Sequence, residues 1–347
     1  MAAGRQLESF DDVRALTEGE LHDLLDRGRP EQRVWAIWAL ALRSSESVAE
    51  LGSRREPDAG VRRNLAVVLA GHGQLELLVA LAKRDPAPEV RAAAMQLVAR
   101  FAIDGKLPHA LVIERVTADT PDVKIAVLGT VFAGAPDWLA ELAEKLLEDR
   151  DADVRYEAFE ALFRIGRDPI ALVWLEEAPE AETRLSLMRW SARGRVRACA
   201  ESLSGASRRL RRLLVESVRA ASWKDLAPAV GDDVALLRAL AKRNPSMFDE
   251  LPLPVLMRAT LREPTAAWVG LVRDRLAQRE LPGDDLPGDV IADFRELCVR
   301  LIGECDAAIT AMKKQRSEDL EHEIAIIEDQ RVVLESALEH ASRLLVH

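Results

Sequence analysis

The chain of 347 residues has little of several residue types that mark other protein classes. Its three cysteines, Cys199, Cys298 and Cys305, are too few for a disulfide-stabilised secreted domain. Aromatic residues make up 4% of the chain, and Tyr156 is the one tyrosine. No apolar run approaches the ~18 residues of a membrane span, and the first residues lack the apolar core of a signal peptide. We therefore expect a folded, soluble, cytoplasmic protein.

Lysine is also scarce, because only 8 of the 48 basic residues are lysines. This arginine bias, with abundant alanine, is typical of GC-rich bacterial genomes. The formal net charge of −10 argues against a protein that coats nucleic acid. The charge is uneven, however: residues 281–347 hold 15 acids and 7 bases, whereas residues 189–224 hold ten bases and two acids.

Motifs with known chemistry are missing from the chain. Six histidines are scattered without an i, i+4 pair. Cys298 and Cys305 are seven residues apart, which suits a buried helix face better than a metal site. Neither a glycine-rich phosphate loop, a dinucleotide fingerprint nor a Gly-x-Ser-x-Gly elbow occurs. We expect no catalytic residue, no metal and no cofactor, and hence no enzyme.

The chain does contain an internal repeat. A basic residue, preceded by valine in four of six copies, recurs at intervals of 29, 29, 33, 31 and 29 residues. The positions three, four and eight residues after it are apolar in every copy. This spacing predicts one buried face of an α-helix. The six basic residues, called anchors below, are Arg33, Arg62, Arg91, Lys124, Arg155 and Arg184.

A second amphipathic segment lies between successive copies, starting near Leu21, Leu75, Ala110 and Trp138. Each repeat is therefore predicted to be two helices joined by a turn rich in Asp, Pro and Glu, residues that suit helix starts. One such pair cannot bury its apolar stripe alone. Stacked pairs can, so the pattern predicts an all-α solenoid.

The pattern resembles the HEAT repeat family in its bacterial HEAT-like form. The turn, the Val-Arg pair and the apolar stripe carry the resemblance, as in Asp153-Val154-Arg155 followed by Ala158 and Phe159. It is clear over residues 16–194 and degrades over 195–280. It implies a right-handed solenoid, here of about seven to nine helix pairs, that binds macromolecules. It also implies that each anchor bridges to an acid in the next repeat's turn, rather than forming an anion-binding ladder.

Two groups of enzymes are related to the HEAT class, and each has typical residues that can be sought in this sequence. The HEAT-like DNA glycosylases imply an acid near a tryptophan, but none of the seven tryptophans is followed by an acid four residues later. The HEAT-type di-iron hydroxylases imply several His-Glu pairs, and this chain has one, His322-Glu323. Neither activity is supported.

Two Pro-Gly pairs over residues 281–288 predict a linker between a repeat domain, 1–280, and a C-terminal helical element, 289–347. Apolar residues in that element follow heptad spacing in two seams, which are out of phase between Met312 and Leu320. We favour two antiparallel helices with a turn near residues 315–317. The alternative is one long interrupted helix that pairs with another chain as an oligomer.

The solvent side of the repeat helices and the Arg-rich segment are the candidate binding surfaces. Trp35 and Trp38 either lie beneath an N-terminal cap or anchor a partner. The segment 189–224 is either a solvated face, a site for an acidic protein surface or a site for a phosphate backbone. We predict a non-catalytic scaffold or adaptor that binds a protein along its curved face, with nucleic-acid binding as the alternative. The candidate residues are Trp35, Trp38, Arg100, Arg164, Arg189, Arg193, Arg208, Arg209, Arg211 and Arg212.

Overall fold

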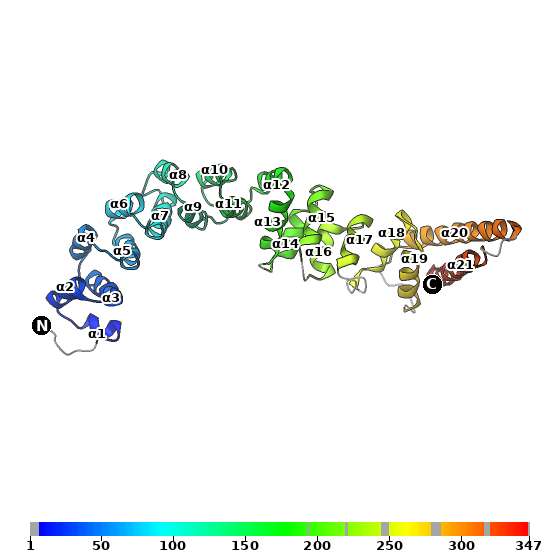
Figure 1. The fold of residues 1–347 in the computed structure, drawn as a ribbon, viewed down its shortest axis with the longest axis horizontal. Coiled ribbons are helices and arrows are strands. Elements are labelled where there is room, and N and C mark those ends of the chain that lie inside the picture. Colours follow the sequence, from blue (N-terminus) through cyan, green and yellow to red (C-terminus); the bar gives the residue numbers. More distant parts are fainter. Residues whose placement is uncertain are drawn as a thin grey trace. The chain divides into compact units, whose positions relative to one another are not determined.

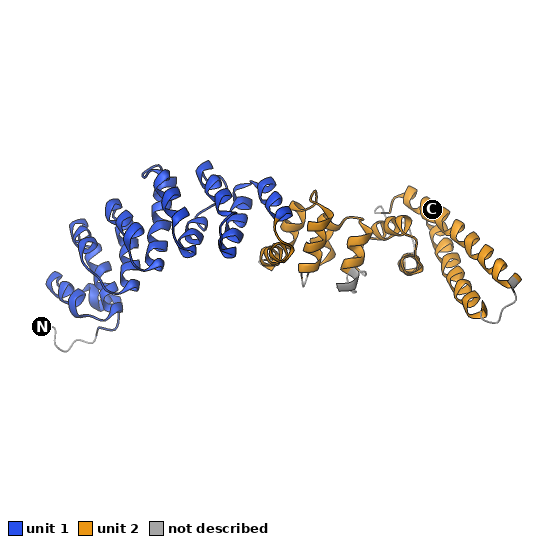
Figure 2. Ribbon diagram, turned by 45° about the horizontal axis from the view of Figure 1, so that its top comes forward, with its two compact units in different colours: residues 1–177 blue, residues 178–347 orange. Residues whose placement is uncertain are grey.

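The computed structural model describes residues 7–192, 194–218, 221–243, 250–278, 286–315 and 320–345. These ranges contain helices and no strand, so the all-α prediction is confirmed. The chain divides into two compact units, residues 1–177 and 178–347 (Figure 2). Most of the predicted linker, residues 281–285, lies outside the described residues. None of the helices in these ranges is long and apolar enough to cross a membrane.

Unit 1 consists of short helices in alternation, two for each repeat. The bounds are α1 Phe10–Arg14, α2 Glu18–Arg27, α3 Pro30–Ala41, α4 Ser45–Ser53, α5 Ala59–Gly71, α6 Leu75–Arg84, α7 Pro88–Ile103, α8 His109–Ala118, α9 Pro121–Leu128, α10 Asp137–Leu146, α11 Ala152–Ile165 and α12 Asp168–Glu177. Prolines open α3, α7 and α9, and aspartates cap α5 and α11. Both residue types suit the first turn, where backbone N–H groups have no helical partner.

The helices of unit 1 form two layers. The odd-numbered helices α3, α5, α7, α9 and α11 pack against one another in order, and each contacts even-numbered neighbours in the sequence (Figure 1). The residue three positions after every anchor is buried, which confirms this part of the predicted stripe. These residues are Ala36, Leu65, Ala94, Val127, Ala158 and, in unit 2, Leu187. Several are alanines, so adjacent helices can approach closely.

The predicted stripe is wrong at several positions. Phe132 is 50% exposed because α9 ends at Leu128, where the Thr130 hydroxyl donates to the Val127 carbonyl at 2.7 Å. Met188 and Ala192 are also exposed.

The opposite error occurs on the side predicted to face solvent, where Glu160 and Ser186 are buried. The buried face of their helices is wider than the stripe, since Ala161 and Trp190, six residues after their anchors, are buried too.

Unit 2 continues with further short helices and ends in two long ones. The bounds are α13 Glu180–Ala192, α14 Val196–Ser202, α15 Arg208–Ser217, α16 Trp223–Val230, α17 Val234–Arg243, α18 Leu253–Arg262, α19 Ala266–Ala277, α20 Gly288–Gln315 and α21 Leu320–Leu345. Helix α20 packs on α18, and α21 packs on α19.

Helices α20 and α21 form an antiparallel hairpin, as the phase shift of the two heptad seams predicts. Arg331 pairs with Asp306 at 3.0 Å, and Lys313 pairs with Glu328 at 3.1 Å. Both pairs link the second half of α20 to the first half of α21, as an antiparallel arrangement requires. The expected turn at 315–317 lies mostly outside the described residues.

Candidate partner-binding surfaces

The anchor cations join each turn of unit 1 to the next. An anchor's side chain reaches the carboxylate that opens the turn of the following repeat, as the resemblance implies. The pairs, with their nitrogen–oxygen distances, are Arg33–Glu56 (3.0 Å), Arg62–Asp85 (2.8 Å), Arg91–Asp119 (2.9 Å) and Lys124–Asp149 (2.6 Å). We call these four pairs the ladder.

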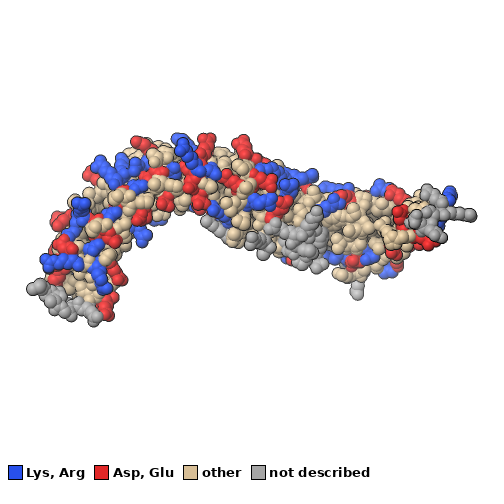
Figure 3. Space-filling view, viewed as in Figure 1, with Lys and Arg blue, Asp and Glu red and all other residues tan. Residues whose placement is uncertain are grey.

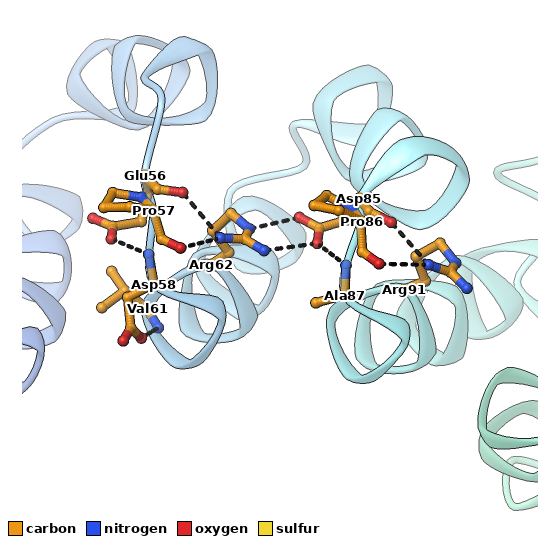
Figure 4. A network of polar contacts seen from close by, with 9 residues as sticks. All are labelled: Glu56, Pro57, Asp58, Val61, Arg62, Asp85, Pro86, Ala87 and Arg91. Carbon is orange, nitrogen blue, oxygen red and sulfur yellow. Dashed lines mark hydrogen bonds and ion pairs between the residues drawn. The ribbon is translucent and has the colours of Figure 1, made fainter.

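One rung of the ladder shows how the contacts are shared (Figure 4). The Nε and Nη2 atoms of Arg62 donate to the two carboxylate oxygens of Asp85, at 2.8 and 3.0 Å. Its Nη1 atom donates to the carbonyl oxygens of Glu56 and Pro57 in its own turn. Asp85 also accepts a hydrogen bond from the N–H of Ala87 at 2.9 Å. In this rung one guanidinium therefore fixes two consecutive turns.

The ladder also sets the ionisation of its carboxylates. Burial alone would raise the pKa of Asp119, but hydrogen bonds from Arg91 and from the Thr120 N–H, with the positive charges nearby, hold that pKa below its usual value. Asp149 has a lowered pKa for the same reasons, with Lys124 as its partner. These anchors are occupied by carboxylates, which supports a bridging role over an anion-binding one.

Two further anchors lie after Arg184 in unit 2, in the stretch 195–280 where the sequence pattern had shown no anchor. Arg211 lies 3.6 Å from Asp233, and Arg238 pairs with Glu263. Asp233 accepts the Ala235 N–H at 3.1 Å, in the same way as the ladder acids of unit 1 cap their own turns. Arg184, Arg211 and Arg238 are 27 residues apart. The signal was present in the sequence, but leucine replaces valine before Arg211 and Arg238, and the interval is shorter.

The Arg-rich segment is largely matched by acids and carbonyls of its own unit. Arg208 pairs with Asp233 at 2.9 Å, and Arg212 pairs with Glu216 at 3.4 Å. Arg209 donates to the Ala178 carbonyl at 3.1 Å, and Arg189 is half-buried on α13. Arg193 lies outside the described residues. Several cations of the segment therefore have partners within unit 2, although the side chains of Arg208 and Arg212 are still 69% and 52% exposed.

The outward side of the odd-numbered helices carries an apolar surface at the N-terminal end of unit 1. Leu42 is 65% exposed and Val67 is 43% exposed, while Trp35 and Trp38 are half-buried. Trp38 and Val67 occupy the same place in successive repeats, five residues after their anchors. Helix α1 packs on α3, which agrees with the N-terminal cap. We call Trp35, Trp38, Leu42 and Val67 the odd-helix patch.

Two arginines predicted for this side behave differently. Arg100, nine residues after its anchor as Leu42 is, is exposed, and its side chain makes no hydrogen bond or ion pair in the described part of the chain. Arg164 is half-buried, lies 3.5 Å from Glu157, and donates to the carbonyls of Leu128 and Val131 at 3.5 Å. Arg100 therefore remains available to a partner, whereas Arg164 is held in place. Leu42 and Val67 were missed, although their places relative to the anchors were identified.

The described residues hold no cluster of three side chains able to bind a metal ion. Basic and acidic side chains alternate over the face of unit 1 drawn in Figure 3, without a continuous region of one sign. What the odd-helix patch offers is exposed apolar area, with the exposed Arg100 on the next odd-numbered helix, α7, and this combination suits contact with a protein surface.

Comparison with known proteins leaves the family open. No family model and no curated protein matches the chain. A solved structure of the protein YibA of Escherichia coli, a structural genomics target, shares 14% identity over 98% of both chains with a TM-score of 0.35. A structure of an engineered protein shares 14% identity over 95% of this chain and 96% of its own, with a TM-score of 0.10. Neither likeness carries an argument about fold or function.

Proposed function

We propose that this chain is a non-catalytic adaptor of the bacterial cytoplasm that binds another protein through the odd-helix patch and Arg100. The observation that carries the proposal is the exposure of Leu42 and Val67 beside two half-buried tryptophans, on helices whose opposite sides are buried. Apolar side chains grouped on a surface mark contact sites, and tryptophan and arginine are enriched among the residues that dominate binding energy.

We further propose that the helix pairs form a right-handed, HEAT-like solenoid, and that the patch lies on its curved face. The repeated ladder supports this, because the same cation-to-carboxylate contact between adjacent turns imposes a similar step from each repeat to the next. The order of contacts among the odd-numbered helices supports it as well.

The test compares proteins retained from a cell extract by three forms of the immobilised full chain. The double variant Leu42→Asp/Val67→Asp puts charge on the patch without touching a buried position. Val173→Asp is the control, since Val173 is 56% exposed on the even-numbered helix α12. We expect a protein held by the parent and the control to be lost from the double variant at least about tenfold. Equal retention by all three forms, or retention of nucleic acid alone, contradicts the proposal.

A further inference from the structure

A groove lies on the other layer of unit 1, between α4 and α6. It has a volume of about 590 Å³. Its floor is apolar and comes mainly from Leu77, Ala80 and Leu81, which lie on one face of α6 because their spacing is i, i+3, i+4. Its mouth is formed by the ends of the two helices and the turns that follow them.

Gly52 shapes the α4 wall of this groove. Helix α4 approaches α6 so closely there that a Cβ on Gly52 would lie 2.5 Å from the Cδ1 atom of Leu77. The residue ten positions before the anchor is Gly52 in this repeat, but Leu81, Glu114 and Lys145 in the three that follow. Among these four repeats, only this one has no side chain at that position, so the α4 wall of the groove is backbone there.

The groove carries an excess of positive charge. Its acids, Glu56 and Asp85, are ladder carboxylates already paired with Arg33 and Arg62, and Arg54 pairs with Asp26. Arg55 and Arg84, at the mouth, are exposed and make no ion pair in the part of unit 1 that the structure describes.

Arg55 and Arg84 each come directly before a ladder acid. The residues in that place before Asp119 and Asp149 are Ala118 and Glu148. The two unpaired guanidiniums therefore occur together at this groove, and no basic residue occupies the corresponding place before Asp119 or Asp149. Positive charges at the C-terminal ends of α4 and α6 interact favourably with the helix dipoles. This effect does not require that both arginines lie at one groove.

We propose that this groove binds an acidic peptide segment of a partner protein. An apolar side chain of the segment packs on Leu77, Ala80 and Leu81, and neighbouring carboxylates pair with Arg55 and Arg84. Guanidinium groups suit carboxylates because they donate two parallel hydrogen bonds. The apolar floor favours a peptide over a polyphosphate, which has nothing to place there. The groove is separate from the odd-helix patch, so the inference stands independently of the proposed function.

The test is selection of a library of random short peptides on the immobilised full chain, followed by affinity measurement with the most enriched peptide. Enriched sequences should combine Asp or Glu with a large apolar residue. The variant Arg55→Glu/Arg84→Glu should weaken binding of that peptide at least about tenfold. Arg63→Glu/Arg150→Glu is the matched control, because both arginines are exposed in unit 1 and unpaired in its described residues. This control should bind like the parent.

Three further measurements make the result decisive. Unchanged melting of both charge-reversal variants shows that the ladder is intact. The variant Leu42→Asp/Val67→Asp should leave peptide binding unchanged. Failure of the proposed function at the odd-helix patch can therefore be distinguished from failure of peptide binding at the groove. Binding of a DNA duplex that is lost on reversing Arg55 and Arg84 would overturn the peptide assignment in favour of phosphate. Enriched peptides without acids, no enrichment at all, or binding insensitive to the reversal would also overturn it.

Discussion

At the residue scale, the anchor cation acts as a joint between repeats. Arg62 makes hydrogen bonds to three residues in two turns, and its side chain is 13% exposed while that of Asp85 is 2% exposed. An ion pair so little exposed is not the weak, solvent-screened type that contributes almost nothing to stability. Its main effect is to keep a desolvated carboxylate satisfied, and this is why its removal is costly.

Replacing Arg62 by methionine is expected to lower the free energy of unfolding by about 3 kcal/mol. The apolar stem is kept, but Asp85 is left buried without its partner. Arg63→Met is the matched control on the next residue, which is exposed and unpaired in the described part of the chain, and its effect should stay within about 0.5 kcal/mol. Urea unfolding of both variants provides the measurement, and equal midpoints would mean that the ladder contributes nothing.

The lowered pKa values of Asp119 and Asp149 predict a stability that depends on acid pH. Since the folded-state pKa lies below the unfolded value of about 3.9, the contribution is present above that value and is lost as pH falls through the folded pKa. Unfolding free energy should therefore decline below about pH 4. The variant Asp119→Asn/Asp149→Asn should be less stable at pH 7 and show a shallower acid decline. Denaturant titrations from neutral to acid pH measure the unfolding free energy of both proteins. If that free energy declines with pH equally in the parent and in the variant, this account is contradicted.

At the element scale, the alanines of the buried stripe set how closely helices stack. Ala94 on α7 and Ala158 on α11 are both fully buried, and α7 and α11 each pack on α9. A small side chain at such a place leaves no room for a larger one, because protein interiors are packed as densely as organic crystals.

Replacing Ala94 or Ala158 by leucine is expected to destabilise unit 1 by about 1–3 kcal/mol through overpacking. Ala133→Leu is a control, since Ala133 is exposed after α9 and should melt like the parent. Thermal melting followed by circular dichroism measures the effect. If both core variants also melt like the parent, the assignment of these positions to helix contacts is wrong.

At the scale of the whole molecule, the C-terminal hairpin covers the end of the repeat array. Val269, Val272 and Leu276 on α19 are buried, and α21 packs against that helix. Terminal repeats need such a cover, because otherwise their apolar side faces water.

Truncation after Gly288 is expected to leave a chain that aggregates, because the apolar side chains of α18 and α19 lose their cover. Light scattering and size-exclusion chromatography on the parent and the truncated chain test this, with a monomeric parent as the companion expectation. A dimeric parent that becomes a stable, soluble monomer on truncation would instead make the hairpin an element that joins two chains.

Local pattern determined the helical class, the repeat and the C-terminal hairpin. Helical periodicity is written in nearby residues, so the positions three residues after each anchor could be identified as buried without any structure. The hairpin followed from the heptad phase for the same reason. The phase of a pattern does not tell where a helix stops, however, and Phe132 was misplaced because α9 ends before it.

Only the tertiary structure decided which charges are available to a partner. The sequence shows ten bases over residues 189–224. In the structure, Arg208 and Arg212 are paired with Asp233 and Glu216. A charge count does not identify ion-pair partners, because the carboxylate that neutralises an arginine can lie in another helix. For the same reason the sequence does not reveal the groove between α4 and α6. Arg55 and Arg84 are 29 residues apart in the chain, and packing brings both to the mouth of one groove.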